Sequence, residues 1–294
     1  AWGGGTDGGG GAGALGVSFA MGAEPGGWMI AEKTKYLVGI GGVTVALRTD
    51  HPEYLRILES RFGGFTGGSA IDYEFDVELV GEPEADPGED VHVERVDGLW
   101  RMRRGDFRAE WDPAARRGWV RQTLNPYAID SLLRILHTLV LARKGGVLMH
   151  AASAIRNGKA FLFTGVSGAG KTTMSRLAPA DATLLTDEIS YVTRSEAGGY
   201  IAHGTPFAGE LAKPGENVSA PLAAIYSLAK GPENRIEEIG RADAVRVILA
   251  NILFFAHEAD MVRDVFDTAW KIAESVPVRR LTFFPDERVW ELIQ

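Results

Sequence analysis

The sequence contains no cysteine. The chain can therefore form no disulfide, and it offers neither thiolate ligands for zinc or iron–sulfur clusters nor a thiol nucleophile. It also lacks an apolar run of the roughly 20 residues that a membrane-spanning helix needs, because Asp130, Arg134 and His137 interrupt the most apolar stretch, 129–142. A net charge of −8 disfavours nucleic acid and anionic membranes as partners. With no secretory signal evident, we expect a cytoplasmic protein.

Glycine is unevenly distributed along the 294 residues. Residues 1–28 are rich in glycine and include an all-glycine run at 8–11. Such a segment buries too little apolar surface to offset the entropy of ordering it. We therefore expect a flexible tail over 1–28, with the natural start of the protein at Met21. The alternative is a tethered peptide segment, because the same stretch carries Trp2 and Phe19.

A β-rich domain is expected over residues 29–122. Its strands are predicted from β-branched and aromatic residues in apolar or alternating runs. Leu58 and Phe62 lie at helical spacing between two such runs, which predicts a short helix. Asp97-Gly98 predicts the tight turn of a hairpin. The expected strands are 43–47, 73–80, 91–93, 99–102, 107–111 and 118–120.

The pattern changes near residue 123. Asn125 is a good N-cap and Pro126 a good first helical residue, and the helix that they open is expected to stop at Gly145. Apolar strands and helices then alternate, which predicts an α/β domain over 123–294. Strands are expected at 147–155, 161–164, 184–185, 189–192, 223–228 and 280–284, and helices at 172–177, 241–255, 260–275 and 287–293.

One motif carries chemistry. The segment 165–172 fits the pattern G-x-x-x-x-G-K-[ST], with an apolar strand before it and a helical segment after it. Its glycines allow successive backbone N–H groups to surround phosphate oxygens, while Lys171 supplies a cation and Thr172 a hydroxyl ligand for Mg²⁺. A chance glycine turn is the alternative. The predicted nucleotide-binding residues are Gly165, Val166, Ser167, Gly168, Ala169, Gly170, Lys171, Thr172 and Thr173.

Two adjacent carboxylates, Asp187 and Glu188, follow the apolar strand 184–185. A carboxylate at this place can hold Mg²⁺ or accept a proton from an attacking hydroxyl. On a strand the two side chains would face opposite ways, so we expect different roles for them. Solvated strand-end residues are the alternative. The chain has no Asn-Lys-x-Asp or Leu-Ser-Gly-Gly-Gln segment and no eukaryotic protein-kinase motif set, which disfavours those nucleotide-binding classes.

The order of these segments resembles a known family. Residues 149–152 (Met-His-Ala-Ala), a turn at 157–158, the strand 161–164, the motif 165–172 and the segment 184–188 follow one another as in the HPr serine kinase/phosphorylase family. The likeness is closest to its HPr-kinase-related branch, some members of which occur beside peptide-modification genes. The extended signature that accompanies HPr recognition is not evident, which disfavours HPr as substrate and phosphorylase activity.

This resemblance implies a P-loop kinase domain, similar in fold to the nucleotide domain of phosphoenolpyruvate carboxykinase, that uses ATP and Mg²⁺. It implies that Asp187 deprotonates the acceptor hydroxyl and that His150 lies near the phosphates. Glu188 stands where the full-length family has a second aspartate. Together, motif and resemblance give Asp187, Lys171, His150 and Glu188 as catalytic residues, and Thr172, Asp187 and Glu188 as metal ligands.

Several other polar residues are weaker candidates. Glu210 follows a loop that could cover the phosphates, although a surface carboxylate is the simpler interpretation. Four arginines could neutralise a transferring phosphoryl group, although solvent-facing arginines are common; they are Arg241, Arg246, Arg279 and Arg280. The arginines of the predicted hairpins, from Arg101 to Arg121, are expected to balance the acidic loop 82–90 rather than to receive an acidic partner.

The leading hypothesis is an ATP- and Mg²⁺-dependent kinase. It transfers the γ-phosphoryl group to a Ser or Thr hydroxyl of a small protein or peptide, such as a precursor of peptide modification. One alternative is a kinase that acts on a small-molecule hydroxyl. Another is a non-catalytic ATP-sensing scaffold whose β-rich domain binds a partner. The full-length family is hexameric, and homo-oligomerisation of this chain is left open.

Overall fold

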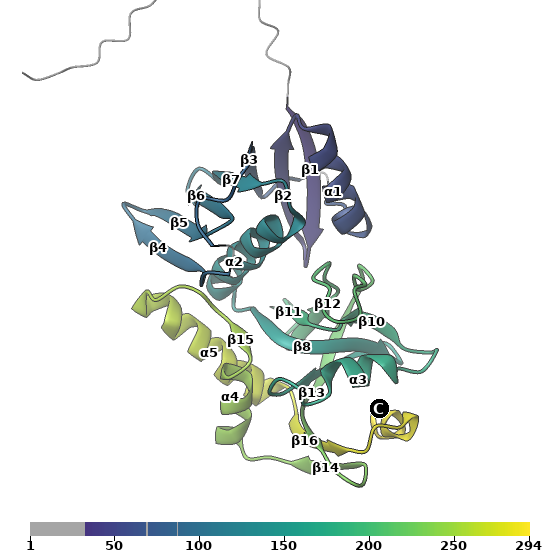
Figure 1. Cartoon of the computed structure of the whole chain (residues 1–294). Helices are drawn as coiled ribbons and strands as arrows, with labels where there is room; N and C mark the ends of the chain where they lie inside the picture. The colour runs from purple at the N-terminus through teal and green to yellow at the C-terminus, as the bar shows by residue number, and fades with distance from the viewer. Residues whose placement is uncertain (1–32, 69, 87) are drawn as a thin grey trace, which may run out of the picture. The chain divides into compact units, whose positions relative to one another are not determined.

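The computed structural model describes residues 33–294, except 69 and 87. The predicted Gly-rich tail and Met21 lie outside the described residues. The described part is a mixed α/β structure whose N-terminal region is rich in strands (Figure 1). Within it, no helix has both the length and the apolar character needed to cross a membrane.

The N-terminal region is built on a seven-stranded sheet in the order β1-β2-β3-β7-β6-β5-β4. The pairs β2–β3 and β3–β7 are parallel, and the others are antiparallel. The strands are β1 (Thr34–Ile40), β2 (Val43–Thr49), β3 (Tyr73–Val80), β4 (His92–Val96), β5 (Leu99–Arg104), β6 (Phe107–Asp112) and β7 (Arg117–Thr123). The helix α1 (Pro52–Phe62) and the short 3-10 helix η1 (Gly63–Phe65) connect β2 to β3.

Local signals account for much of this region. Asp97 and Gly98 have φ angles of 52° and 86°, as the predicted hairpin turn between β4 and β5 requires. The arginines of the hairpins pair mainly with carboxylates on neighbouring strands, such as Arg101 with Glu110. The predicted pairing with the acidic loop is therefore largely wrong. Among the described residues one such pair is present, in which the Nη1 atom of Arg121 lies 4.0 Å from the Oε1 atom of Glu84.

The helix α2 (Pro126–Lys144) follows β7 and is buried over most of its length. The Asn125 side chain accepts hydrogen bonds from the backbone N–H groups of Tyr127 and Ala128, which confirms the predicted N-cap. Gly145 ends the helix with a φ of 69°. Apolar residues of α2 belong to one core with residues of the first sheet and with Leu148, which lies in the second sheet.

The second sheet has nine strands, with the main order β10-β8-β11-β12-β13-β16-β14; β9 pairs with β8 and β13, and β15 pairs with β8. Strand β13 runs parallel to β9 and β16, and the other pairs are antiparallel. The strands are β8 (Val147–Arg156), β9 (Lys159–Thr164), β10 (Thr183–Thr186), β11 (Ile189–Arg194), β12 (Tyr200–His203), β13 (Ser219–Lys230), β14 (Arg235–Glu238), β15 (Ile252–Leu253) and β16 (Val278–Phe283).

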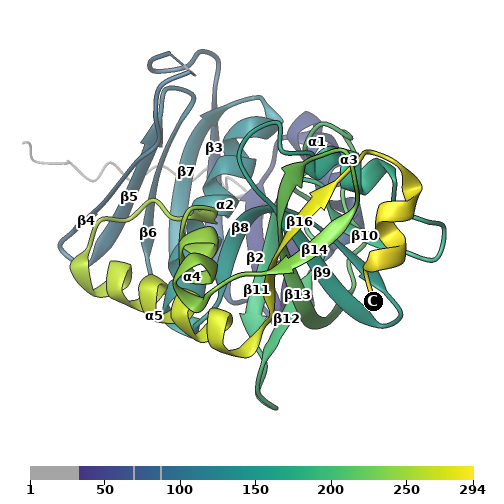
Figure 2. The same cartoon turned by 90° about the horizontal axis from the view of Figure 1, so that it is seen from below.

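The helices of this region are α3 (Lys171–Arg176), α4 (Arg241–Leu249), α5 (Ala259–Ser275) and the 3-10 helix η2 (Glu287–Leu292). Figure 2 shows α4 and α5 next to each other along one edge of the view. The predicted helix 241–255 is wrong in its second half. It ends at Leu249 because Ile252 and Leu253 pair with β8, and the carbonyl of Asn251 accepts the N–H of His150.

Candidate functional site

The glycine-rich segment 165–170 connects the buried strand β9 to α3, as the sequence predicts. Gly168 and Gly170 have φ angles of 76° and 113°, which a residue with a Cβ rarely adopts. A Cβ at Gly170 would also lie 2.5 Å from the Cζ atom of Phe283. The path of this loop therefore depends on glycine at these positions, as a close approach of backbone to phosphate would require.

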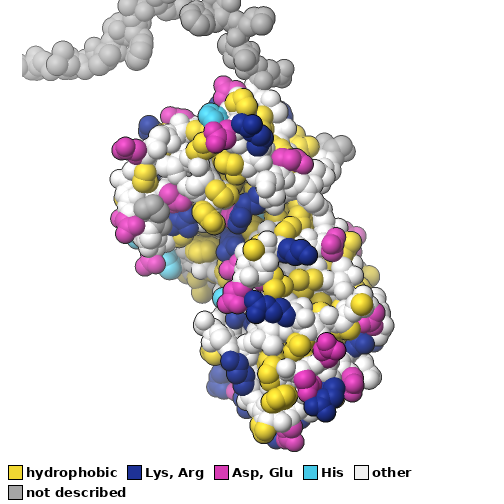
Figure 3. All heavy atoms as spheres, turned by 45° about the vertical axis from the view of Figure 1, so that its right-hand side comes forward, with side chains coloured by type: hydrophobic (Ala, Val, Ile, Leu, Met, Phe, Trp, Pro, Cys, Tyr) yellow, Lys and Arg dark blue, Asp and Glu magenta, His cyan; other side chains and the backbone are white. Residues whose placement is uncertain are grey.

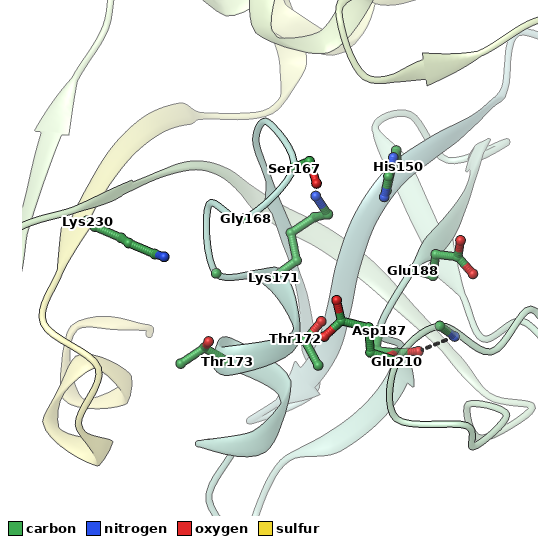
Figure 4. A pocket seen from close by; sticks show the side chains of 12 residues that line it. His150, Ser167, Gly168, Lys171, Thr172, Thr173, Asp187, Glu188, Glu210 and Lys230 are labelled. Atoms are coloured by element: carbon green, nitrogen blue, oxygen red, sulfur yellow. Dashed lines mark hydrogen bonds between the residues drawn. The ribbon is translucent and has the colours of Figure 1, made fainter.

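The loop borders a cavity of about 410 Å³ (Figure 4). Most of the candidate residues meet there, although they come from separate segments of the chain. The residues that line the cavity are His150, Ser167, Gly168, Gly170, Lys171, Thr172, Thr173, Asp187, Glu188, Gly209, Glu210 and Lys230. Three predicted nucleotide-binding residues do not line it: Gly165, Val166 and Ala169. Val166 is instead 80% exposed.

Lys171 lies at the start of α3 and is largely buried. Its ammonium group donates to the carbonyl of Gly165 at 3.0 Å. Burial lowers the pKa of Lys171, while the charges of Glu188 and Glu210 act in the opposite direction. The lysine thus presents a partly desolvated cation to the cavity, where an anion would interact with it more strongly than in water.

The carboxylate of Asp187 is held by the loop that follows β12. Its Oδ1 accepts the backbone N–H of Gly209 and its Oδ2 that of Leu211, both at 2.8 Å. The side chain is only 3% exposed. Asp187 is therefore fixed in orientation by two donors from one loop, and Figure 4 shows one of these hydrogen bonds.

Asp187 and Glu188 do not lie on a strand, contrary to the prediction. Strand β10 ends at Thr186 and β11 begins at Ile189. The hydroxyl of Thr186 accepts the N–H groups of Glu188 and Ile189 at 3.1 and 3.2 Å. This side-chain turn breaks the alternation of a strand, so both carboxylates line the same cavity.

Glu188 interacts with Arg134, a residue of α2 that the sequence analysis did not place at the site. The Oε2 atom of Glu188 accepts a hydrogen bond from the guanidinium of Arg134 at 3.2 Å. That guanidinium also lies over the ring of Phe207, 5.0 Å from its centroid. Burial raises the pKa of Glu188, and the charge and hydrogen bond of Arg134 partly oppose the rise. The signal for Arg134 was present as one of two charged residues, with Asp130, in the mostly apolar first part of α2.

His150 projects from β8 into the cavity and is exposed there. Burial of part of the ring lowers the pKa of His150, and the positive charges of Lys171 and Arg134 lower it further. The imidazole is therefore neutral near pH 7. A neutral ring can donate or accept a hydrogen bond without adding charge.

Lys230 is a second cation of the cavity, and the sequence analysis missed it. It ends β13, and Figure 4 shows it on the far side of the Gly168 turn from His150. The four arginines named as weaker candidates do not line the cavity. Three of them are paired elsewhere, Arg241 with Glu274, Arg246 with Asp243 and Arg279 with Glu238, and Arg280 lies on β16 opposite Glu237.

The cavity can be tested for its fit to a divalent cation. In residues 33–294 without 69 and 87, no group of three or more His, Asp or Glu side chains is arranged to hold a metal ion by itself. The cavity does bring the Thr172 hydroxyl together with the carboxylates of Asp187 and Glu188. These hard oxygen donors suit Mg²⁺, which commonly takes one or two carboxylates and completes its shell with phosphate oxygens and water.

Fold and site thus define a mixed α/β protein with a glycine loop and three carboxylates at one polar cavity. The chain belongs to the family described as SynChlorMet cassette protein ScmC, whose model matches residues 122–294. This range contains every residue that lines the cavity. A comparison with curated proteins finds no match.

Proposed function

We propose that this protein is a cytoplasmic P-loop kinase of the HPr-kinase-like type. It would use ATP and Mg²⁺ to phosphorylate a Ser or Thr hydroxyl of a small protein or peptide. The observation that carries the proposal is the single cavity in which Lys171 and Thr172 meet the carboxylates of Asp187 and Glu188. A phosphoryl-transfer site needs this combination of a phosphate-binding loop, a cation and a proton acceptor.

Nucleotide binding rests on the loop and its flanking cations. Backbone N–H groups of 165–170 surround phosphate oxygens, and Lys171 and Lys230 add positive charge from two sides. Thr172, Asp187 and Glu188 are the side chains that would hold Mg²⁺, which neutralises phosphate charge when bound.

The transfer forms a bond between the acceptor oxygen and the γ-phosphorus and breaks the bond to the β–γ bridging oxygen, so that ADP leaves. The hydroxyl proton passes to a carboxylate. We assign this role to Glu188 because its carboxylate is partly exposed at the cavity, whereas both oxygens of Asp187 already accept backbone N–H groups. Asp187, held by two backbone donors, orients the loop and faces the metal position. This assignment exchanges the roles that the family resemblance implies for the two residues.

The test is transfer of radioactive label from γ-labelled ATP to a hydroxyl acceptor. Lys171→Met is expected to lower transfer by at least about 100-fold, because it removes a cation from the charge that develops in the transition state. Lys159→Met is the matched control, since Lys159 is exposed at the start of β9 and does not line the cavity. Nucleotide binding without any transfer would refute the kinase and favour the ATP-sensing scaffold.

A further inference from the structure

A second hollow lies next to the proposed kinase site. It has a volume of about 510 Å³, within the range of about 300–1,000 Å³ that is usual for ligand pockets. One side is formed by α1, with Arg56, Ile57 and Ser60. The other side is formed by Pro126 and by the loop between β12 and β13, which Figure 1 shows directly below α1. We call this hollow the α1 groove.

The loop between β12 and β13 separates the α1 groove from the cavity by a single layer of backbone. Pro206, Ala208 and Pro214 line the groove, whereas Gly209 and Glu210 line the cavity. Ala208 and Gly209 are neighbours in sequence, so their Cα atoms are about 3.8 Å apart. A peptide that lies in the groove and crosses this loop would place its following residues in the cavity.

The helix α2 provides a second link between the two hollows. Asp130 binds Arg61, which lines the groove, with its Oδ1 accepting from the Arg61 Nε at 2.7 Å. One turn further along α2, Arg134 binds Glu188 of the cavity. The two α2 residues are four positions apart, which is about 6 Å along a helix axis. The loop between β12 and β13 and the contacts of α2 thus each place the groove beside the cavity.

The walls of the α1 groove favour an extended peptide as its occupant. Three prolines and two alanines provide small apolar surfaces without long side chains. The groove also carries Arg56, which is exposed and has no ion-pair partner within the described part of the chain, together with Glu53; Arg61 is paired with Asp130. Figure 3 shows Lys and Arg side chains interspersed with Asp, Glu and hydrophobic side chains on one face of the molecule. An acidic side chain of a bound peptide would complement the unpaired charge of Arg56.

We propose that the phosphate acceptor is an extended peptide segment that lies in the α1 groove, with an acidic residue near Arg56 and its Ser or Thr hydroxyl in the cavity at Glu188. This inference rests on the proposed kinase function and names its substrate class. Small apolar residues beside the acceptor would contact the prolines and alanines of the loop. The N-terminal region then contributes to acceptor recognition through α1, while the C-terminal region supplies the nucleotide site.

The test uses the full chain, γ-labelled ATP and a degenerate pool of synthetic peptides with a central Ser or Thr, with free L-serine as a second acceptor. The parent is expected to label peptides and to select Asp or Glu near the acceptor. Arg56→Glu should reverse this selection toward Lys and Arg, and Ser60→Trp should raise the KM for peptides by about ten-fold without a comparable change in the KM for ATP. A loss through misfolding would not reverse selectivity.

Arg263→Glu is the matched control, because Arg263 is exposed on α5 and lines neither hollow. The groove assignment is overturned if Arg56→Glu selects the same peptides as the parent, or if the parent labels L-serine and no peptide. Both of these results would leave the proposed kinase activity unrefuted. Absence of label on every acceptor would instead refute the proposed function, and the two failures are therefore distinguishable.

Discussion

The two adjacent carboxylates should respond very differently to removal of their charge. Asp187→Asn changes a buried side chain whose two oxygens each accept a backbone N–H, from Gly209 and from Leu211. An asparagine offers one acceptor oxygen and an NH₂ group, so one of the two backbone donors would face another donor. Glu188→Gln changes a side chain that is 30% exposed and bonded to one partner, Arg134.

The expected magnitudes follow from these contacts. Hydrogen bonds to a charged acceptor contribute about 1.5–3 kcal/mol each, and neutral ones about 1 kcal/mol. Asp187→Asn loses one such bond and weakens the other, which gives a loss of about 3 kcal/mol in the free energy of unfolding. For a chain of this size the melting temperature would fall by roughly 6–12 °C. Glu188→Gln removes a partly exposed ion pair and should cost less than about 1 kcal/mol.

Urea unfolding and hydrogen exchange measure both effects. In the Asp187→Asn variant the amides of Gly209 and Leu211 should exchange faster than in the parent, because their acceptor has been weakened or lost. Glu188→Gln should keep the parent's exchange at these amides and yet lower phosphotransfer. The reasoning is refuted if Asp187→Asn unfolds at the parent's denaturant midpoint with unchanged exchange in the loop. Full transfer by Glu188→Gln would return the proton-acceptor role to Asp187.

Two further predictions concern titratable side chains that are wholly or partly buried. Arg134→Met removes the cation that lowers the pKa of Glu188, so this pKa should rise and the acidic limb of the kcat/KM profile should move to higher pH; an unchanged profile would contradict the assignment of Glu188. Burial lowers the pKa of His137 from 6.5 to about 3. Between pH 6.5 and about pH 3, His137 is protonated in the unfolded chain but not in the folded chain. The free energy of unfolding therefore falls by about 1.4 kcal/mol for each unit by which the pH is lowered. His137→Gln should flatten this slope in urea titrations at several pH values, whereas an equal slope would show that His137 is not its source.

Signals that act within a few residues were readable from the sequence. The Asn125 cap and the Asp97-Gly98 turn depend on local hydrogen bonds and backbone conformations, and both are present as expected. Four strands, β1, β12, β14 and β15, were not among the expected strands, and the last three are short and lack a clear alternating pattern. The hydrogen bonds of β14 and β15 go to strands far away in sequence, and such pairing overrides local preference.

The same distinction between local signals and long-range contacts applies to the candidate site. The glycine loop is a contiguous segment, so its residues could be named from the pattern alone. Arg134 lies 54 positions before Glu188 in sequence, and no motif connects the two residues. Lys230 reaches the cavity because its strand, β13, pairs in parallel with β9, which leads directly into the loop. The orientation of Asp187 and Glu188 was predicted wrongly because the turn made by the Thr186 hydroxyl replaces the alternation of a strand.

The helix α2 connects the region matched by the family model to the rest of the chain. The family match begins at residue 122 and so includes α2 but not the first sheet. Yet apolar residues of α2 such as Leu132 pack in one core with Phe75 and Val120 of that sheet. The residues on α2 that face the site, Arg134 above all, are therefore held in place from both sides. Because the first sheet packs against the helix whose Arg134 binds Glu188, the geometry of the cavity depends on residues outside the matched range.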